Sequence, residues 1–356
     1  MSPRRYIHEH DSKPVKPTLP THGLNAKGLP TVPAELLLEI LSYMQTMPIP
    51  CTCEPMRARN KERERKMTLF ALFQTCRSLR SALLPFVWER IEVYTPDTSR
   101  SFNNHWCKNI ATDLIEQLEI VTIREPSFAS FVKTVSVAIS GYSAYKVLRE
   151  FARCLALMPN LQTIQIIDLL DSSVAPNHSA VRESDFAKAF KSYTFPSIKH
   201  VILSPRAHGL LRCFPNAQRV YLNLSWAPYH RQYCVLFDSC KKWLFEVAGH
   251  CPNVEEFGCS GELGQDFMEL VISTLPKLRS VQIHFNLIYS GFISWLSELR
   301  NLEKIEFVVP ICIKQLEGKR EEAIRILEKS NGDAKKKMLV ISHPEIGNVE
   351  VVKLTT

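Results

Sequence analysis

The sequence predicts an α/β protein in which a small helical module is followed by a solenoid of strand–helix units with parallel strands. Three observations support this prediction. A leucine-rich helical pattern lies at residues 32–44. Short segments with apolar residues at i, i+3 and i+5 recur along the rest of the chain. Helix-like stretches separate these segments, as expected for stacked repeat units.

The composition is that of an ordinary globular protein, with 356 residues, 45% hydrophobic and 22% charged. No apolar run approaches the roughly 18 to 20 residues of a membrane helix, so we expect no membrane span. Residues 1–28 lack the pattern of a secretory signal or a mitochondrial presequence, and we interpret them as a flexible tail. Eleven scattered cysteines then indicate reduced thiols in the cytoplasm or nucleus. The net charge of +8 permits acidic partners without requiring them.

The first helical pattern, "VPAELLLEILSYM" from Val32 to Met44, carries more leucine than a single buried face requires. Pro33 suits the first helical position, because its φ angle is helical and its missing N–H group would have no partner there. At about 100° per residue, the apolar side chains cover roughly 200° of the helix circumference. Either the helix is buried on two sides within its own domain, or one side contacts a second protein.

A second helical pattern is predicted to begin near Thr68, after an interruption from Thr46 to Lys66. Leucine, phenylalanine and cysteine repeat there at three- and four-residue spacing, and Pro85 is expected to stop the helix before Trp88 closes the module. Three short helices give a small core. We therefore expect the module to expose an apolar surface that a second protein covers.

The stretch "VPAELLLEILSYM" followed by "LFQTCRSLRSALLPFVW" resembles an F-box. The opening proline and acid, the leucine-rich helix, "CRSLR" and the final tryptophan stand in the family's order over Leu29 to about Trp88. The module is assigned to 29–90, and its insertion at about 46–66 is longer than the loop usual in the family. The resemblance implies docking on the Skp adaptor of an SCF-type cullin-RING ubiquitin ligase. It places nine residues at or beneath that interface: Val32, Pro33, Leu36, Leu37, Ile40, Leu41, Cys76, Leu79 and Trp88.

Residues 91–356 contain the repeated strand pattern. The predicted strands are "FVKTVSV", "PNLQTIQI", "PSIKHVIL", "PNAQRVYL", "PNVEEFGC", "PKLRSVQI" and "RNLEKIEF". Five of them follow an apolar residue and a proline, which ends a helix and directs the chain into extended structure. "WERIEV" fits the same spacing as a first strand. "KREEAIRILEKSNG" and "KMLVIS" are predicted as a helix and strand that cap the far end.

Successive units begin about 19 to 37 residues apart, and several fall in the window of roughly 20 to 29 residues typical of leucine-rich repeats. Asn286 ends one unit as in the fuller leucine-rich form, but the other units lack this asparagine. A doubly wound sheet is the alternative, because it also alternates strands and helices. In a solenoid the residues between the apolar positions line a concave face. That face is predicted to display Thr163, Gln165, His200, Arg219, Tyr221, Glu256, Ser280, Gln282, His284, Lys304 and Glu306.

The sequence offers little for catalysis, cofactors or metals. Cys51, Cys53, His105 and Cys107 are the one formal zinc set, but a single residue between ligands is uncommon in structural zinc sites. No Gly-rich phosphate loop, nucleophile elbow or H-E-x-x-H motif is present. We therefore expect no cofactor, no metal and no enzyme activity.

The basic run "RARNKERERK" at 57–66 is compatible with nucleic-acid binding or a nuclear import signal. A solvated insertion is the favoured interpretation, because two glutamates interrupt the positive charge and no aromatic residue is available to stack on a base.

The sequence thus leads to the hypothesis of a substrate-recognition subunit of an SCF-type ligase. It predicts the Skp adaptor and the cullin-RING core as partners, together with a protein target whose identity the sequence does not give. A leucine-rich-repeat binding scaffold without a ligase role is the alternative.

Overall fold

The computed structural model describes most of the chain beyond residue 55. The described residues are 36, 39, 56–75, 77–93, 106–168, 181–223, 233–259, 265–284, 292–309, 316–333, 336–343 and 348–354.

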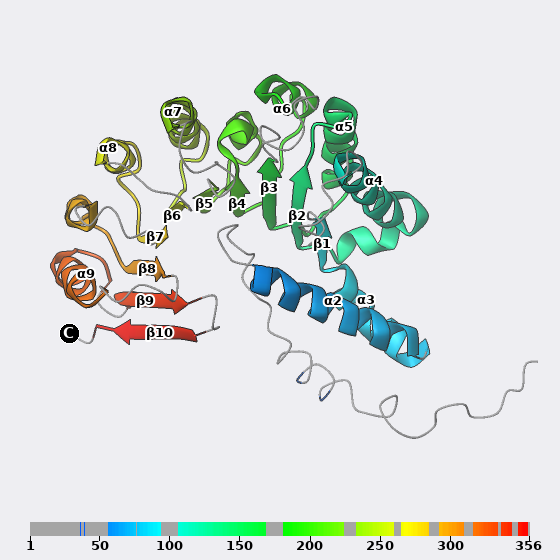
Figure 1. Ribbon diagram of the computed structural model, residues 1–356, viewed down its shortest axis with the longest axis horizontal. Coiled ribbons are helices and arrows are strands. Elements are labelled where there is room, and N and C mark those ends of the chain that lie inside the picture. Colours follow the sequence, from blue (N-terminus) through cyan, green and yellow to red (C-terminus); the bar gives the residue numbers. More distant parts are fainter. Residues whose placement is uncertain are drawn as a thin grey trace, which may run out of the picture.

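Ten strands form one curved sheet in which the spatial order follows the chain from β1 to β10 (Figure 1). All neighbours from β1 to β9 are parallel, and β10 runs antiparallel to β9. The strands are β1 (Arg90–Val93), β2 (Thr134–Ile139), β3 (Thr163–Asp168), β4 (His200–Leu203), β5 (Arg219–Leu222), β6 (Glu256–Cys259), β7 (Ser280–His284), β8 (Lys304–Val308), β9 (Met338–His343) and β10 (Asn348–Lys353).

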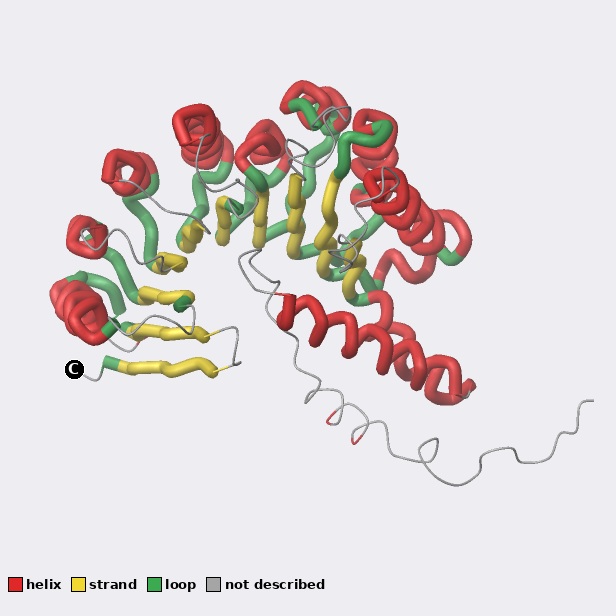
Figure 2. Tube along the Cα trace, viewed as in Figure 1, coloured by secondary structure: helices red, strands yellow, loops and turns green. Residues whose placement is uncertain are grey.

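Helical segments connect the strands along the outer side of this arc, while the strands line the inner side (Figure 2). The α-helices are α2 (Met56–Thr75), α3 (Arg77–Trp88), α4 (Trp106–Glu119), α5 (Ala144–Leu155), α6 (Glu183–Ala189), α7 (Tyr233–His250), α8 (Gln265–Thr274) and α9 (Glu317–Lys329). Shorter turns complete the set: the π segment η2 (Ile120–Arg124) and the 3-10 segments η3 (Pro126–Ser130), η4 (Pro205–Cys213) and η5 (Phe292–Glu298).

This arrangement is a leucine-rich-repeat-like α/β solenoid and rules out the doubly wound alternative. A doubly wound sheet reverses its strand order at a switch point and carries helices on both faces. Here each strand pairs with the next one along the chain, and the helical segments that connect the strands cover one face (Figures 1 and 2). The seven predicted repeat strands and the strands predicted at both ends are all present.

The apolar positions of the repeat build the core between the sheet and the outer helices. Val132, Leu161, Ile198 and Leu278, which open four of the units, are at most 1% exposed. The later apolar positions of each strand are buried as well, together with the inward faces of the helices. Each unit therefore buries its apolar side chains against its neighbours, as a stacked repeat requires.

A recurring turn precedes the strands. In the unit that begins with Met158 and Pro159, the N–H of Leu161 donates to the carbonyl of Met158 at 3.3 Å. The same bond recurs at Ala217 and Leu278, and also at Leu302, whose turn has no proline. Proline suits the second position of such a turn because its φ angle is already set. The proline therefore marks a β-turn that directs the chain into the strand.

The amino-terminal helices differ from the prediction. The helix expected to begin near Thr68 begins at Met56, so residues 56–66 are helical rather than an irregular insertion. The helix α2 ends at Thr75, and α3 runs from Arg77 through Pro85 to Trp88. Leu83 and Val87, on either side of the proline, are buried in the cluster between α2 and α3. This packing holds the last turn despite the missing N–H group.

Five further elements were not predicted from the sequence: α4, η2, η3, η4 and β10. The helix α4 covers the first strands with Leu114 and Leu118, both 0% exposed. The segment η4 joins β4 to β5, and β10 adds an antiparallel strand at the end of the sheet. None of the helices in the described parts of the chain is long and apolar enough to cross a membrane.

Candidate recognition surface

Two rows of side chains run across the concave face of the sheet. The backbone register aligns the first strand positions as Thr134, Thr163, His200, Arg219, Glu256, Ser280 and Lys304. Two residues further along, it aligns Ser136, Gln165, Ile202, Tyr221, Gly258, Gln282 and Glu306. Because side chains alternate between the faces of a strand, both rows lie opposite the buried apolar positions. Ten of the eleven predicted residues lie on these rows, and His284 lies at the end of β7.

A polar cluster occupies the middle of the two rows. The Arg219 guanidinium lies 3.1 Å from the Glu256 carboxylate, and the Tyr221 hydroxyl donates to the same carboxylate. The Tyr221 ring is 5.1 Å from the ring of His200. A Cβ atom at Gly258 would overlap the Tyr221 ring, so glycine makes room for the tyrosine. These contacts hold the cluster in one arrangement across β4, β5 and β6.

Burial lowers the pKa of His200 to about 4, and the positive charge of Arg219 lowers it further. The Nε2 atom of His200 is buried and has no hydrogen-bond partner among the described residues. A protonated imidazole would therefore be both poorly solvated and close to another cation. His200 is neutral at neutral pH.

A second polar cluster lies on β7 to β9. The Lys304 ammonium is 2.6 Å from the Glu306 carboxylate, to which Gln282 donates at 2.9 Å. Ser342 on β9, which was not predicted, donates to Glu306 at 3.4 Å. The two clusters place acids and bases next to one another, so the face carries balanced rather than single-sign charge.

Two predicted residues are not displayed on the concave surface. Gln165 is 0% exposed and accepts a hydrogen bond from Ser136, and Tyr221 is 7% exposed. Their side chains contact the neighbouring strands instead of projecting from the face. Of the ten predicted residues on the two rows, Arg219 is the most accessible, with 59% of its side chain exposed.

The prediction also missed residues on the first two strands. Arg90 and Glu92 of β1 form an ion pair at 2.8 Å, and Thr134 and Ser136 of β2 continue the two rows. The signal for them was present, because "WERIEV" and "FVKTVSV" share the spacing of the later units. Their polar residues occupy the same positions between the apolar ones.

The helices α2 and α3 build a separate small cluster before β1. Leu79 is 4% exposed within it and packs with Leu69 and Leu83. Trp88 is half-buried and stacks on Phe128 of the solenoid, with ring centroids 5.5 Å apart. These two predicted residues therefore lie beneath any surface that the helices offer.

Leu36, another predicted adaptor residue, is helical and 52% exposed. The other predicted adaptor residues lie outside the described parts of the chain: Val32, Pro33, Leu37, Ile40, Leu41 and Cys76.

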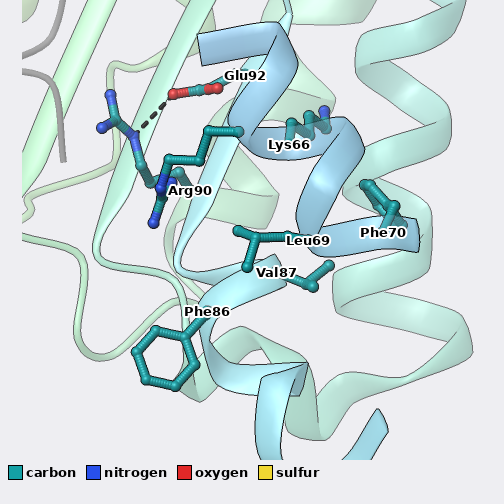
Figure 3. A pocket seen from close by; sticks show the side chains of 8 residues that line it. Lys66, Leu69, Phe70, Phe86, Val87, Arg90 and Glu92 are labelled. Carbon is teal, nitrogen blue, oxygen red and sulfur yellow. Dashed lines mark ion pairs between the residues drawn. The ribbon is translucent and has the colours of Figure 1, made fainter. Parts of the chain in front are cut away.

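A shallow depression lies where α2 and α3 meet β1 (Figure 3). Leu69, Phe86 and Val87 line it from the helices, and Arg90 lies at its other side with its guanidinium directed to Glu92. The side chains of both helices thus contact the first strand through a mixture of apolar and charged groups.

The structure gives no support to a zinc site in the described residues, where no group of three or more histidine, cysteine or acidic side chains could hold a metal. Cys107 is 1% exposed at the start of α4. Cys51, Cys53 and His105 lie outside the described parts of the chain. Burial raises the pKa of Cys251 to about 12, as expected for a cysteine that serves as a small apolar core residue.

Gly258→Ala should disturb the central cluster. The new methyl group would displace the Tyr221 ring and break its hydrogen bond to Glu256, and we expect a loss of about 1–3 kcal/mol in the free energy of unfolding. Urea denaturation followed by tyrosine fluorescence measures this loss. Gly249→Ala in α7 is the matched control, because a Cβ there meets nothing within 4 Å and alanine favours a helix. Equal stability of the two variants would contradict the proposed packing.

His200 should make stability depend on pH. Its pKa is about 4 in the folded chain and roughly 6.5 when unfolded, so the unfolded state takes up a proton first as the pH falls. Stability is therefore lost between about pH 6.5 and pH 4, by at most roughly 3 kcal/mol. We expect His200→Gln to reduce this loss. Unfolding midpoints in urea over that range measure it, and identical pH profiles for both proteins would show that the imidazole is not buried.

Comparison with known proteins gives partial structural likenesses. No protein-family model matches the chain, and no curated protein matches it. The leucine-rich repeat-containing protein LegL7 from Legionella pneumophila is 13% identical over 67% of this chain and 72% of that one, with a TM-score of 0.41. The structure of the TLR13–ssRNA13 complex is 15% identical over 53% of this chain and 26% of that one, with a TM-score of 0.31. The assignment of the solenoid rests on the strand order and repeat register of this chain.

Proposed function

We propose that this chain is the substrate-recognition subunit of an SCF-type ubiquitin ligase. Its amino-terminal helices would dock on the Skp adaptor, and the concave face of the solenoid would bind a target protein. The observation that carries the proposal is the F-box-like pattern of residues 32–88, which leads directly into the first strand of the solenoid. Such a subunit performs no bond chemistry of its own.

The junction between the two parts supports this function. The helix α3 ends at Trp88 and β1 begins at Arg90, so a single residue separates them. The stacking of Trp88 on Phe128 and the ion pair between Lys133 and Glu89 at 3.0 Å add contacts across the junction. A short, packed junction keeps a bound target at a defined distance from the adaptor. It therefore raises the effective concentration of the target near the charged enzyme more than a flexible tether would.

The concave face has the chemistry of a surface that recognises proteins. It combines accessible Arg219 with paired acids, amides and hydroxyls, and it carries charge of both signs. Complementary charges and hydrogen bonds of this kind determine specificity and orientation in protein interfaces. We infer that Arg219 and the accessible part of Glu256 lie at the centre of the target site.

A binding scaffold without a ligase role is the second candidate function. The solenoid favours it independently, because the concave face is complete without any contribution from the amino-terminal helices. The two functions differ in one property, which is capture of the Skp adaptor.

Leu37→Asp combined with Ile40→Asp should abolish capture of the Skp adaptor, because two carboxylates would enter an apolar interface. Copurification followed by mass spectrometry measures the adaptor and also identifies candidate targets. The matched control is Ile123→Asp combined with Leu157→Asp, which changes the same residue types at positions 58% and 46% exposed on the solenoid. We expect the control to retain the adaptor.

Full adaptor capture by the double variant would show that this helix face is not the docking surface. If the unchanged protein captures no adaptor but retains a target, the scaffold function replaces the ligase function.

Arg219→Glu should weaken target binding at least about tenfold without changing adaptor capture, because it reverses the most accessible charge of the concave face. Recovery of the targets found by copurification measures the effect. Arg149→Glu is the control, since Arg149 is exposed on the outer helix α5. A target lost equally from both variants would place its binding site elsewhere.

A further inference from the structure

The last strand of the sheet has one open side. Along its whole length, from Asn348 to Lys353, β10 pairs with β9 in a regular antiparallel register without a bulge. No other strand in the described parts of the chain pairs with it, because it stands last in the sheet (Figure 1). Open strand edges are sites of pairing with another chain, and proteins commonly protect them with proline, bulges or very short strands. The strand β10 contains no proline and no bulge and is six residues long; of the charged side chains that also protect edges, it carries one lysine on this side, Lys353.

The hydrogen bonds of β10 identify which backbone groups face outward. The N–H of Leu354 donates to the carbonyl of Lys337 at 3.1 Å, so residue 354 is directed toward β9. Successive residues of a strand direct their N–H and C=O groups to opposite sides, and the even-numbered residues therefore pair with β9. The backbone groups of Val349, Val351 and Lys353 are directed toward the open side.

The side chains of the same residues continue the concave face. Val351 is aligned with Val340, which in turn is aligned with Glu306. Val349 is 57% exposed and Val351 is 49% exposed. On the opposite face, Val352 packs against the core, and Glu350 is neutralised by Arg320 at 2.6 Å. The strand edge thus presents an apolar pair of valines with no unpaired acid beside them.

The two ends of the sheet differ. At the first end, α3 contacts β1, and both α2 and α3 line the depression that includes Arg90 and Glu92 (Figure 3). At the last end, Arg320 of α9 pairs with Glu350 on the outer face of β10, but no described element lies along the edge of the strand. Among the described residues, the edge of β10 therefore remains open.

We propose that this edge pairs with a second copy of the same chain. The two β10 strands would run antiparallel about a two-fold axis at Val351, with each Val351 facing its counterpart and Val349 facing the partner's Lys353. In this register, the outward-facing N–H and C=O groups of Val349, Val351 and Lys353 on one copy pair with those of the other copy. The two strands then share about six hydrogen bonds. The proposal does not depend on the proposed ligase function.

The choice of a second copy follows from symmetry and charge. An antiparallel strand edge is complementary to itself, as an interface on a two-fold axis requires. The two Lys353 side chains lie four residues apart along the strands, roughly 13 Å, which exceeds the screening length of about 8 Å at physiological salt. Because the two-fold contact uses the β10 edge of both copies, the pairing closes at two copies.

The expected affinity is modest. One added strand buries less area than the roughly 1,200–2,000 Å² of a standard interface, so we expect a dissociation constant in the range of about 1–100 μM. Sedimentation velocity of the full chain over this concentration range should show the mass rising from 40.8 kDa towards twice that value.

Two charge variants test the register. Val351→Lys and Val351→Glu should each be monomeric, because like charges would face each other across the axis. A one-to-one mixture of the two variants should restore the dimer, because opposite charges then meet. Val351→Thr keeps the backbone N–H and the size of the side chain, and it should dimerise with a dissociation constant within about tenfold of the unchanged protein. Circular dichroism of each variant checks that the fold is retained.

A protein that remains monomeric up to about 100 μM would overturn the proposal. A dimer that both charge variants retain would also overturn it, since the contact would then lie on another surface. If each variant is monomeric but the mixture fails to pair, residue 351 does not lie on the axis and the proposed register is wrong.

Discussion

The fold depends on backbone hydrogen bonding that runs without interruption from one unit to the next. The residue before each strand donates its N–H to the carbonyl of the corresponding residue in the preceding unit, at 2.7–2.9 Å. The donor and acceptor pairs are Lys133 to Glu89, Gln162 to Lys133, Lys199 to Gln162, Gln218 to Lys199, Glu255 to Gln218, Arg279 to Glu255 and Glu303 to Arg279. These bonds extend the sheet by one residue and pair the backbone N–H and C=O groups that precede the strands. Because they come from the backbone, any residue type except proline can donate them, and they need no asparagine side chain.

This backbone constraint determines which side chains meet on the concave face. Parallel strands in constant register place residues from equivalent positions side by side, although they are 19 to 37 residues apart in the chain. Arg219, Tyr221 and Glu256 come together in this way, as do Gln282, Lys304 and Glu306. The side chains satisfy one another before any partner binds. A partner would therefore meet a preorganised surface and lose less conformational entropy on binding.

Different elements lie at the two ends of the repeat array. A stacked repeat cannot bury the apolar face of its terminal units by itself. The helices α2 and α3 lie at the first end and contain the second part of the F-box-like sequence, so this part of the proposed adaptor module lies directly against the repeat. At the last end, α9 and the reversed strand β10 cover the core but leave a strand edge exposed.

The sequence alone determined the class of the fold, the position of the repeat strands and which residues lie on each face. This was possible because the apolar spacing is a local pattern that repeats, so each strand can be recognised from its own segment of sequence. Tertiary structure decided the rest. The length of α2 and the continuation of α3 through Pro85 depend on packing between the helices. The burial of Gln165 and Tyr221 depends on neighbours in other strands, including a glycine at 258 that no local pattern connects to the tyrosine at 221. The open edge of β10 likewise follows from the order of strands in space, since pairing joins segments that only the folded chain brings together.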